Sequence, residues 1–278
     1  MPLTRPRLCC LIGDPVEHSL SPLMFNSAFA AEGMDCAYLA FRVGRSDLGR
    51  AVEGLRALGF VGCNVTIPHK VEVMKHIDRH DESAQGTGSV NVILNRGGEL
   101  IGYSTDGYGA MKALEREGIR LEGKRILLLG YGGGARAVAF ELARSLKGVE
   151  IMIAGRDMVK ASAFAGEIGA WARAGALPLG DVGRSGADVI INCSPVGMWP
   201  NTDESPLPAE SISMGTTVMD LVYNPSETKL LKIAKARGCR TVGGLEMLVQ
   251  QGAKAFEIWF GRTPPVSVMR RAVEGGLR

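Results

Sequence analysis

The segment that decides the fold is the apolar run Arg125-Ile-Leu-Leu-Leu129, followed directly by Gly130-Tyr-Gly132-Gly-Gly-Ala135-Arg136. The run predicts a buried strand, and the residues after it match the pattern G-x-G-x-x-A at a turn from strand into helix. Gly130 allows the tight turn, Gly132 lets the backbone approach a phosphate, and Ala135 lets the helix pack on the strand. Unpaired N–H groups at the helix start favour an anion. A dinucleotide site is therefore predicted, and a glycine-rich turn without ligand is the weaker alternative.

The same alternation of strands and helices extends through the chain. Short apolar runs predict strands at 8–12, 37–41, 62–65, 90–94, 125–129, 150–154, 188–192 and 217–221. The segments between and after them predict helices at 23–32, 47–58, 70–81, 227–237 and 247–260, and after Gly133 and Met158. Strands that alternate with helices predict an α/β fold with largely parallel sheets.

Composition narrows the class of protein. The chain has 278 residues, of which 46% are hydrophobic and 22% charged, and its formal net charge is +3. These values are typical of a folded globular protein, and a charge so balanced argues against nucleic acid or an anionic membrane as partner. No apolar run approaches the ~18 residues of a membrane-spanning helix, and no signal peptide is recognised.

The cysteine and histidine pattern indicates neither disulfides nor a metal site. The six cysteines form no C-x-x-C pair, which favours reduced, buried thiols and a cytoplasmic location. His76 and His80 lie four residues apart on a predicted helix, but no third ligand has a recognisable spacing. We therefore expect no metal.

The end of the second strand in the second half bears on the choice of cofactor. In NAD sites a carboxylate there bonds the ribose 2′-hydroxyl, whereas in NADP sites an Arg meets the 2′-phosphate. Here Gly155 takes the usual place of the carboxylate and Arg156 and Asp157 follow it. Arg156 favours NADP. Asp157 leaves NAD possible, and the alternative reading is an exposed turn in which Asp157 caps the next helix.

Polar residues cluster at strand ends in the first half. They occur in Gly13-Asp-Pro-Val-Glu-His-Ser19-Leu-Ser21-Pro22, in Asn64-Val-Thr66-Ile-Pro-His-Lys70, in Ser89-Val-Asn91 and in Ser104-Thr-Asp106-Gly107. Each stretch alone is compatible with a turn or a helix cap. Together they place hydroxyl, amide, amine and carboxylate groups where open α/β sheets bind ligands. A lysine there can act as an acid or base if it is partly desolvated.

With these motifs in order, the chain resembles the shikimate dehydrogenase family, including the quinate/shikimate dehydrogenases. The resemblance covers nearly the whole length. It is carried by the four stretches just quoted and by G-Y-G-G-G-A-R-A at 130–137, I-N-C-S-P-V-G-M at 191–198, D-L-V-Y-N-P at 220–225 and G-G-L-E-M-L-V-Q-Q-G-A at 243–253.

The resemblance implies a two-domain α/β fold and an activity. A substrate-binding catalytic domain would span 1–106, with the C-terminal segment 243–278 returning to it. A Rossmann NADP-binding domain would span 107–242. The activity is the NADP-dependent, reversible reduction of 3-dehydroshikimate to shikimate in chorismate and aromatic amino-acid biosynthesis. The partners would be the small-molecule substrate and NADP, in a monomer or homodimer.

The resemblance also implies roles for individual residues. Lys70 and Asp106 match the catalytic pair. The substrate-binding positions are matched by Ser19, Ser21, Thr66, Asn91, Tyr223 and Gln251. The cofactor-binding positions are matched by Gly130, Gly132, Gly133, Arg136, Gly243 and Met247, to which Arg156 and Asp157 are added from the strand-end argument.

Several positions depart from the family pattern. They are Phe25, Val92, Ser104, Tyr131 in place of the loop alanine, and Gly155-Arg156-Asp157 in place of Asn-Arg-Thr. Two alternatives therefore stay open. One is the same chemistry on quinate or an amino analogue with NAD, and the other is a non-catalytic dinucleotide-binding sensor.

Overall fold

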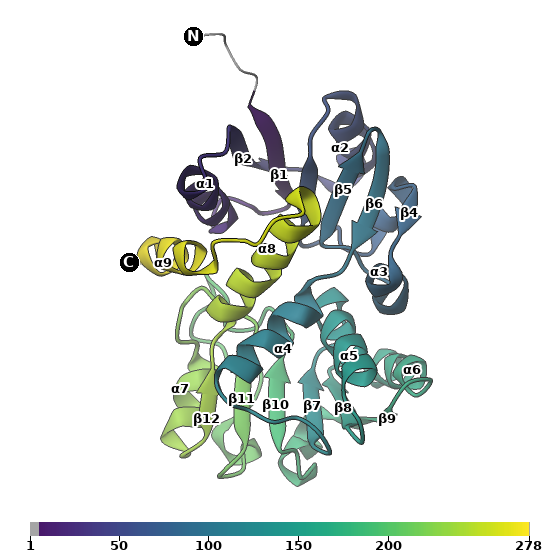
Figure 1. The fold of residues 1–278 in the computed structure, drawn as a ribbon. Coiled ribbons are helices and arrows are strands. Elements are labelled where there is room, and N and C mark those ends of the chain that lie inside the picture. The colour runs from purple at the N-terminus through teal and green to yellow at the C-terminus, as the bar shows by residue number, and fades with distance from the viewer. Residues whose placement is uncertain (1–5, 278) are drawn as a thin grey trace. The chain divides into compact units, whose positions relative to one another are not determined.

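The chain folds into two compact α/β units. The computed structural model describes residues 6–277. Unit 1 comprises residues 6–105 and 249–276, and unit 2 comprises residues 106–248 together with Leu277. Figure 1 labels the elements of both units.

Unit 1 is built on a mixed six-stranded sheet with the order β2-β1-β3-β5-β6-β4. Its strands are β1 (Arg7–Gly13), β2 (Cys36–Arg42), β3 (Gly62–Val65), β4 (Arg79–His80), β5 (Val92–Arg96) and β6 (Glu99–Tyr103). Its helices are α1 (Ser21–Ala31), α2 (Leu48–Ala57), α3 (Glu82–Thr87), α9 (Val266–Gly276), and the 3-10 turns η1 (Arg45–Asp47) and η2 (Glu72–His76). Strands β1, β2 and β3 are parallel, whereas β5 is antiparallel to both β3 and β6.

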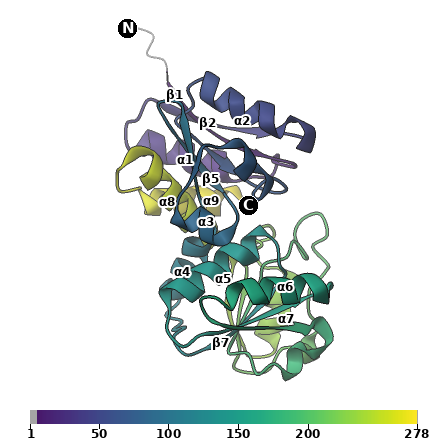
Figure 2. The ribbon, with the colours of Figure 1, turned by 90° about the vertical axis from the view of Figure 1, so that its right-hand side faces the viewer.

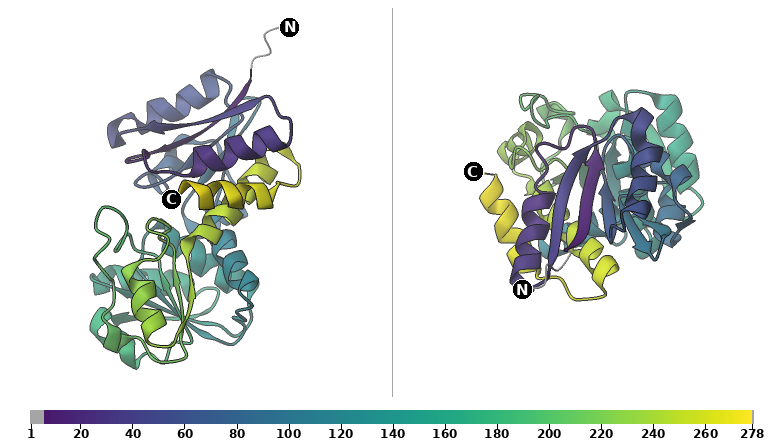
Figure 3. Two further views of the ribbon diagram at one scale, coloured as in Figure 1. Left: turned by 90° about the vertical axis from the view of Figure 1, so that its left-hand side faces the viewer. Right: turned by 90° about the horizontal axis from the view of Figure 1, so that it is seen from above.

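Both faces of this sheet are covered, as the unbroken apolar run of β1 predicts. Cys10 and Ile12 pack with α2 in one apolar cluster. The opposite face carries an aromatic group in which Phe25 of α1 lies against Tyr38 of β2 and Trp259 of α8. Helix α8 (Gly244–Phe260) begins in unit 2 and ends in unit 1. Helices α1 and α9 lie side by side in the left view of Figure 3.

Unit 2 has a six-stranded sheet in which all strands are parallel, with the order β12-β11-β10-β7-β8-β9. The strands are β7 (Arg125–Leu129), β8 (Glu150–Gly155), β9 (Arg173–Pro178), β10 (Val189–Asn192), β11 (Thr217–Asp220) and β12 (Arg240–Val242). The helices are α4 (Asp106–Arg116), α5 (Gly133–Ser145), α6 (Met158–Ile168), α7 (Lys229–Ala236), and the 3-10 turns η3 (Leu179–Arg184) and η4 (Ala209–Ser211). Read from β9, this is the Rossmann order 3-2-1-4-5-6, whose direction reverses between β7 and β10.

The strand β7 contributes to a separate apolar layer on each face. Ile126 and Leu128 pack in a cluster with α4, α5 and α6, whereas Leu127 and Leu129 pack in another with α7. Figure 2 shows α5 and α6 together over this sheet. The two parallel-rich sheets confirm the predicted α/β class.

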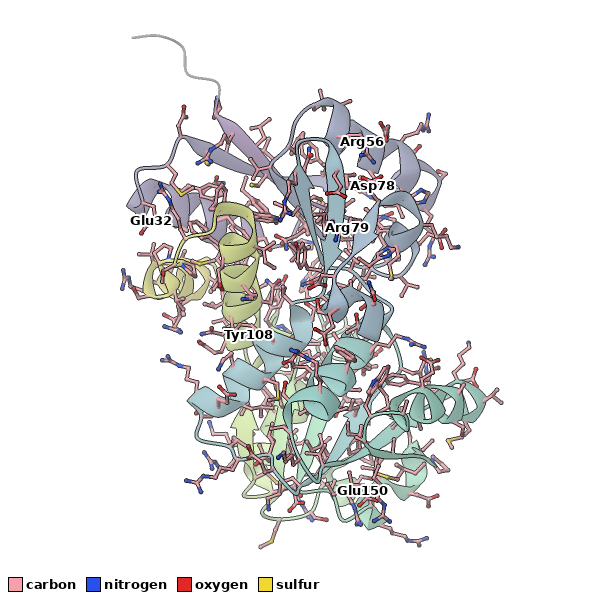
Figure 4. The ribbon with its side chains drawn as sticks, turned by 45° about the vertical axis from the view of Figure 1, so that its right-hand side comes forward. Glu32, Arg56, Asp78, Arg79, Tyr108 and Glu150 are labelled. Carbon is pink, nitrogen blue, oxygen red and sulfur yellow. The ribbon has the colours of Figure 1, made fainter. Side chains whose placement is uncertain are left out.

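One predicted helix is wrong. Residues 70–81 form η2 and the short strand β4 instead. Asp78 holds this segment, because its carboxylate accepts from Leu100 N at 2.7 Å and pairs with Arg56 of α2 at 2.8 Å (Figure 4). His80 then pairs with Gly102 of β6. These tertiary contacts outweigh the local helical pattern.

Among residues 6–277 no helix is long and apolar enough to cross a membrane. Every cysteine is a free thiol in this part of the chain, and no group of three metal-ligating side chains occurs in it.

Candidate functional site

The loop between β1 and α1 carries two of the predicted substrate-binding hydroxyls. Ser19 is half-buried and its Oγ accepts a hydrogen bond from Ser21 N at 3.2 Å. Ser21 begins α1 and is buried, and Pro22 follows it in the first helical turn. Proline there loses no helical hydrogen bond, so the Ser-Pro pair favours a helix start at this point. The structure thus brings Ser19 and Ser21 together at the C-terminal end of β1.

The turn after β3 carries Thr66 and Lys70. Thr66 N donates to Ile12 O at 2.9 Å, which prolongs the pairing of β3 with β1. The ring of buried His69 contacts Val43 O through Nε2 at 2.7 Å. Val90 N donates to Lys70 O at 2.7 Å. This bond fixes the main chain of Lys70 beside Val90, the residue that precedes Asn91. The Lys70 side chain is half-buried.

A buried polar cluster joins Asn91, Thr105 and Gln251. Thr105 N donates to Asn91 Oδ1 at 2.7 Å, and Asn91 Nδ2 donates to Thr105 Oγ1 at 3.0 Å and to Gln251 Oε1 at 3.3 Å. All three residues are at most 8% exposed. Since buried polar groups are stable only when paired, these bonds hold the amides in fixed orientations. Residues from two distant parts of the sequence thus form one site in unit 1.

Asp106 follows this cluster directly in the chain. It is 5% exposed and is the first residue of α4. The positive end of the helix dipole favours a carboxylate at this position. Gly107 is required beside it, because a Cβ there would lie 2.2 Å from Ala137 O of α5.

The glycine-rich turn of unit 2 has the geometry predicted for a dinucleotide site. Gly130 has φ +110°, which favours glycine, and its N donates to Ala154 O at 2.8 Å. A Cβ on Gly130 would lie 3.6 Å from Ser194 N, so the turn lies beside the end of β10. Gly132 is the N-cap of α5 and gives no side-chain cap, and Gly133 is the first helical residue. The helix start and the reversal of strand order thus meet, which fits a bound pyrophosphate.

Tyr131 and Gly155 form a mutually dependent pair. A Cβ on Gly155 would lie 2.5 Å from Tyr131 Cε1, so the phenol ring covers the backbone where the family pattern has a side chain. The ring also packs against the apolar cluster of unit 2. The two departures from the family pattern at positions 131 and 155 therefore compensate each other.

The predicted phosphate-binding arginine is engaged elsewhere in this structure. Arg136 forms a two-pronged ion pair with Glu167 of α6, with Nη2 to Oε1 at 3.0 Å. Its guanidinium also lies over the Phe164 ring, 5.0 Å from the centroid. The arginine lowers the pKa of the Glu167 carboxyl. A phosphate would have to compete with this pair for Arg136.

Asp157 is the N-cap of α6, which is the alternative that the sequence left open. Its Oδ1 accepts from Val159 N at 3.0 Å and Lys160 N at 3.1 Å, and its Oδ2 pairs with Lys160 Nζ at 3.3 Å. The Lys160 backbone bond, followed by the Lys160 ammonium, lowers the pKa of Asp157. Arg156 beside it is exposed.

Asp157→Thr should therefore leave the NADP/NAD preference nearly unchanged. Threonine caps a helix too, and the charge that is lost is already paired with Lys160. We expect the ratio of kcat/KM values for NADP and NAD to change less than about threefold. Asp157→Ala is the matched control and should lower the thermal unfolding temperature because the cap is lost. A tenfold shift toward NADP in Asp157→Thr would show that the carboxylate faces the ribose.

The remaining predicted residues lie at the ends of β11 and β12. Tyr223 is half-buried, three residues after β11. Gly243 joins β12 to α8, and Met247 packs in the apolar cluster of unit 2. Leu221 O approaches Gly244 so closely that a Cβ there would lie 2.5 Å away, which brings the start of α8 against the end of β11.

Comparison with known proteins agrees with this geometry. Residues 11–93 match the family model described as shikimate dehydrogenase substrate binding domain, and residues 244–274 match shikimate 5′-dehydrogenase C-terminal domain. The shikimate dehydrogenase (NADP(+)) of Moorella thermoacetica is 48% identical over 97% of this chain and 93% of its own. The chain belongs to the shikimate dehydrogenase family.

Solved structures of the family share the whole fold. A shikimate dehydrogenase in complex with NADP+ is 46% identical, with TM-score 0.93 over 98% of this chain and 96% of that chain. The shikimate 5-dehydrogenase of Thermus thermophilus, in complex with NADP(H) and shikimate, is 37% identical, with TM-score 0.90 over 98% of this chain and 100% of that chain.

Two side chains that hold predicted site residues in place were not predicted from the sequence. Thr105 links Asn91 to the main chain of Gln251, and Asn64 Nδ2 donates to Asn91 O at 3.2 Å. Both lie inside quoted motifs, next to or two residues from a predicted site residue. That adjacency was the available signal, but which partners they bind depends on tertiary contacts.

Proposed function

We propose that this chain is an NADP-dependent oxidoreductase that interconverts 3-dehydroshikimate and shikimate, in the biosynthesis of chorismate and aromatic amino acids. The observation that carries the proposal is the buried cluster of Asn91, Thr105 and Gln251 beside the main chain of Lys70. Uncharged amides and hydroxyls next to an amine suit a polyhydroxylated ring that exchanges a proton. The names of similar proteins of the family include both shikimate and NADP.

The substrate is held by neutral donors and acceptors. We assign the carboxylate to the Ser19 and Ser21 hydroxyls, and the ring hydroxyls to Thr66, Asn91 and Gln251. Tyr223 is a further substrate ligand. The paired amides are oriented before substrate arrives, so little ordering remains at binding.

Lys70 and Asp106 exchange the proton of the reacting hydroxyl. NADPH, when bound, supplies the hydride for the ketone. Lys70 Nζ donates a proton to the oxygen that becomes the alcohol, and Asp106 orients the ammonium and shares the same hydroxyl. Lys70 and Asp106 thus act together as the acid–base unit of the proposed reaction.

The cofactor rests on unit 2. Gly130, Gly132 and Gly133 would offer the pyrophosphate backbone N–H groups at the start of α5, and Arg136 would pair with phosphate in place of Glu167. Exposed Arg156 meets the 2′-phosphate, which favours NADP over NAD. Gly243 and Met247 would lie beside the nicotinamide.

We further propose a reducing, cytoplasmic setting, since each cysteine among residues 6–277 is a free thiol. Both a monomer and a homodimer are compatible with the proposed reaction.

A four-way assay tests the function. Nicotinamide absorbance is followed with shikimate or quinate, each with NADP or NAD. We expect the highest kcat/KM with shikimate and NADP. Activity only with quinate, or only with NAD, would overturn the substrate or cofactor assignment and retain the Lys70–Asp106 chemistry. Cofactor binding without turnover in any combination would favour the sensor alternative.

A further inference from the structure

A buried tyrosine lies behind the predicted carboxylate-binding serines. Tyr38 of β2 is 0% exposed, and its hydroxyl lies 2.7 Å from Asn64 Oδ1. The Ser21 side chain lies beside the phenol oxygen on its other side. The phenol thus joins a residue at the start of α1 to a residue of β3. A hydroxyl deep in an apolar core is costly unless it is paired, as this one is with Asn64.

The direction of each hydrogen bond in this chain of groups is determined. Asn64 Nδ2 donates to Asn91 O at 3.2 Å, so Oδ1 is the atom that faces Tyr38. Because Oδ1 can only accept, the single phenol proton goes to Asn64. The phenol oxygen can then only accept, and the Ser21 hydroxyl beside it is the group placed to donate. The order of donation therefore runs from Ser21 to Tyr38, to Asn64 and to Asn91.

Tyr38 itself is held rigidly. Its ring stacks on Phe25 with centroids 4.5 Å apart and 6° between the planes, and Trp259 lies 6.2 Å away. Its backbone N and O are both bonded by the Asn26 side chain, at 2.8 and 2.9 Å. Such a side chain cannot follow a ligand, and it gives Ser21 a fixed reference point.

We infer that Tyr38 is a positioning residue of the substrate site: its buried hydroxyl fixes Ser21 in relation to Asn64 and Asn91. The inference rests on the proposed function, in which Ser21 holds the substrate carboxylate and Asn91 a ring hydroxyl. Asn64 and Tyr38 then set the distance between the two ends of the bound ring. Nothing in this role requires Tyr38 to touch substrate or cofactor.

Tyr38→Phe tests the role, since it removes the hydroxyl and keeps the stacked ring. We expect the KM for shikimate to rise about three- to tenfold, as for loss of one hydrogen bond, while kcat and the KM for NADP stay within about twofold. Tyr103→Phe is the matched control and should leave all constants unchanged, because Tyr103 contacts Asn91 through its backbone carbonyl, which phenylalanine retains. Thermal unfolding of each variant monitors the fold.

A double-mutant cycle separates positioning from general damage. Ser21→Ala alone should raise the KM for shikimate, and adding Tyr38→Phe should raise it by less than twofold more, because the two changes remove the same arrangement. An active wild type with an unchanged KM in Tyr38→Phe, or fully multiplicative effects of the two substitutions, would overturn the inference alone. A wild type that does not turn over shikimate would overturn the proposed function and this inference together.

Discussion

We expect Lys70→Ala to lower kcat for shikimate oxidation by about 10²–10⁴-fold, the range for loss of a positioned acid–base group. The turn that carries Lys70 is fixed by the bond from Val90 N to Lys70 O, which alanine retains. The substitution therefore removes the amine without moving the main chain. The KM for NADP should stay within about twofold because the proposed cofactor residues are all on unit 2. Steady-state kinetics with both substrates measures the two effects.

Lys75→Ala is the matched control for this experiment. Lys75 lies on the same segment, is exposed, and pairs with Glu72 at 2.9 Å. An exposed pair of this kind contributes little to stability, so the substitution should leave the fold intact and kcat unchanged. If Lys70→Ala retained more than about a tenth of wild-type kcat, the amine would not be the proton donor.

The parts of the fold that the sequence predicted are those decided by local patterns. The apolar run before Gly130 and the glycine spacing after it need no distant partner to be recognised, and the strand–turn–helix was confirmed. The strands β4, β6, β9 and β12 and the helices α3, α4 and α9 were not predicted. Strand β9 is poor in large apolar residues and depends on its pairing with β8, and α4 contains two glycines that lower its helical propensity.

For the site, the sequence predicted which residues stand at strand ends but not which of them meet. The bond between Asn91 and Gln251 joins residues 160 positions apart, so no local pattern contains it. The ion pair of Arg136 with Glu167 joins residues 31 positions apart and likewise follows from packing in unit 2. The Asp157 cap is a local contact with Val159 and Lys160, and the sequence already offered it as an alternative. Tyr38 was missed because a tyrosine within an apolar strand is typical of a core residue.

Asp220→Asn should stabilise the protein, and the gain should grow with pH. Asp220 ends β11 and is 0% exposed, and burial raises the pKa of its carboxyl to about 6 from 3.8. Three hydrogen bonds partly offset the effect of burial on this pKa. Oδ1 accepts from Asn192 Nδ2 and Val222 N, and Oδ2 accepts from Thr228 Oγ1. The folded state therefore binds the proton more tightly than the unfolded state does. Stability is then highest below pH 3.8 and is lost as the pH rises through 6.

The size of the effect follows from the difference in pKa. The rise of the Asp220 pKa from 3.8 to about 6 corresponds to ~3 kcal/mol of lost stability at pH 8. The gain in Asp220→Asn should be about 1 kcal/mol smaller than this, because the amide disturbs the bond to Thr228. We expect Asp220→Asn to gain about 1–2 kcal/mol more in the free energy of unfolding at pH 8 than at pH 5, measured by urea denaturation. A gain that did not change with pH would show that Asp220 titrates normally.

Asp188→Asn is the control of opposite sign. Asp188 precedes β10 in the same sheet, and the bond from Arg125 N at 2.9 Å, followed by the Lys124 ammonium, lowers the pKa of its carboxyl. Its contribution to stability is therefore present at neutral pH and lost as the pH falls through the folded pKa. The amide should destabilise the protein at pH 8, and by less as the pH falls. Since Asp220 and Asp188 lie near opposite ends of the parallel sheet, opposite pH trends would separate the penalty of burial from any general effect of removing a carboxylate.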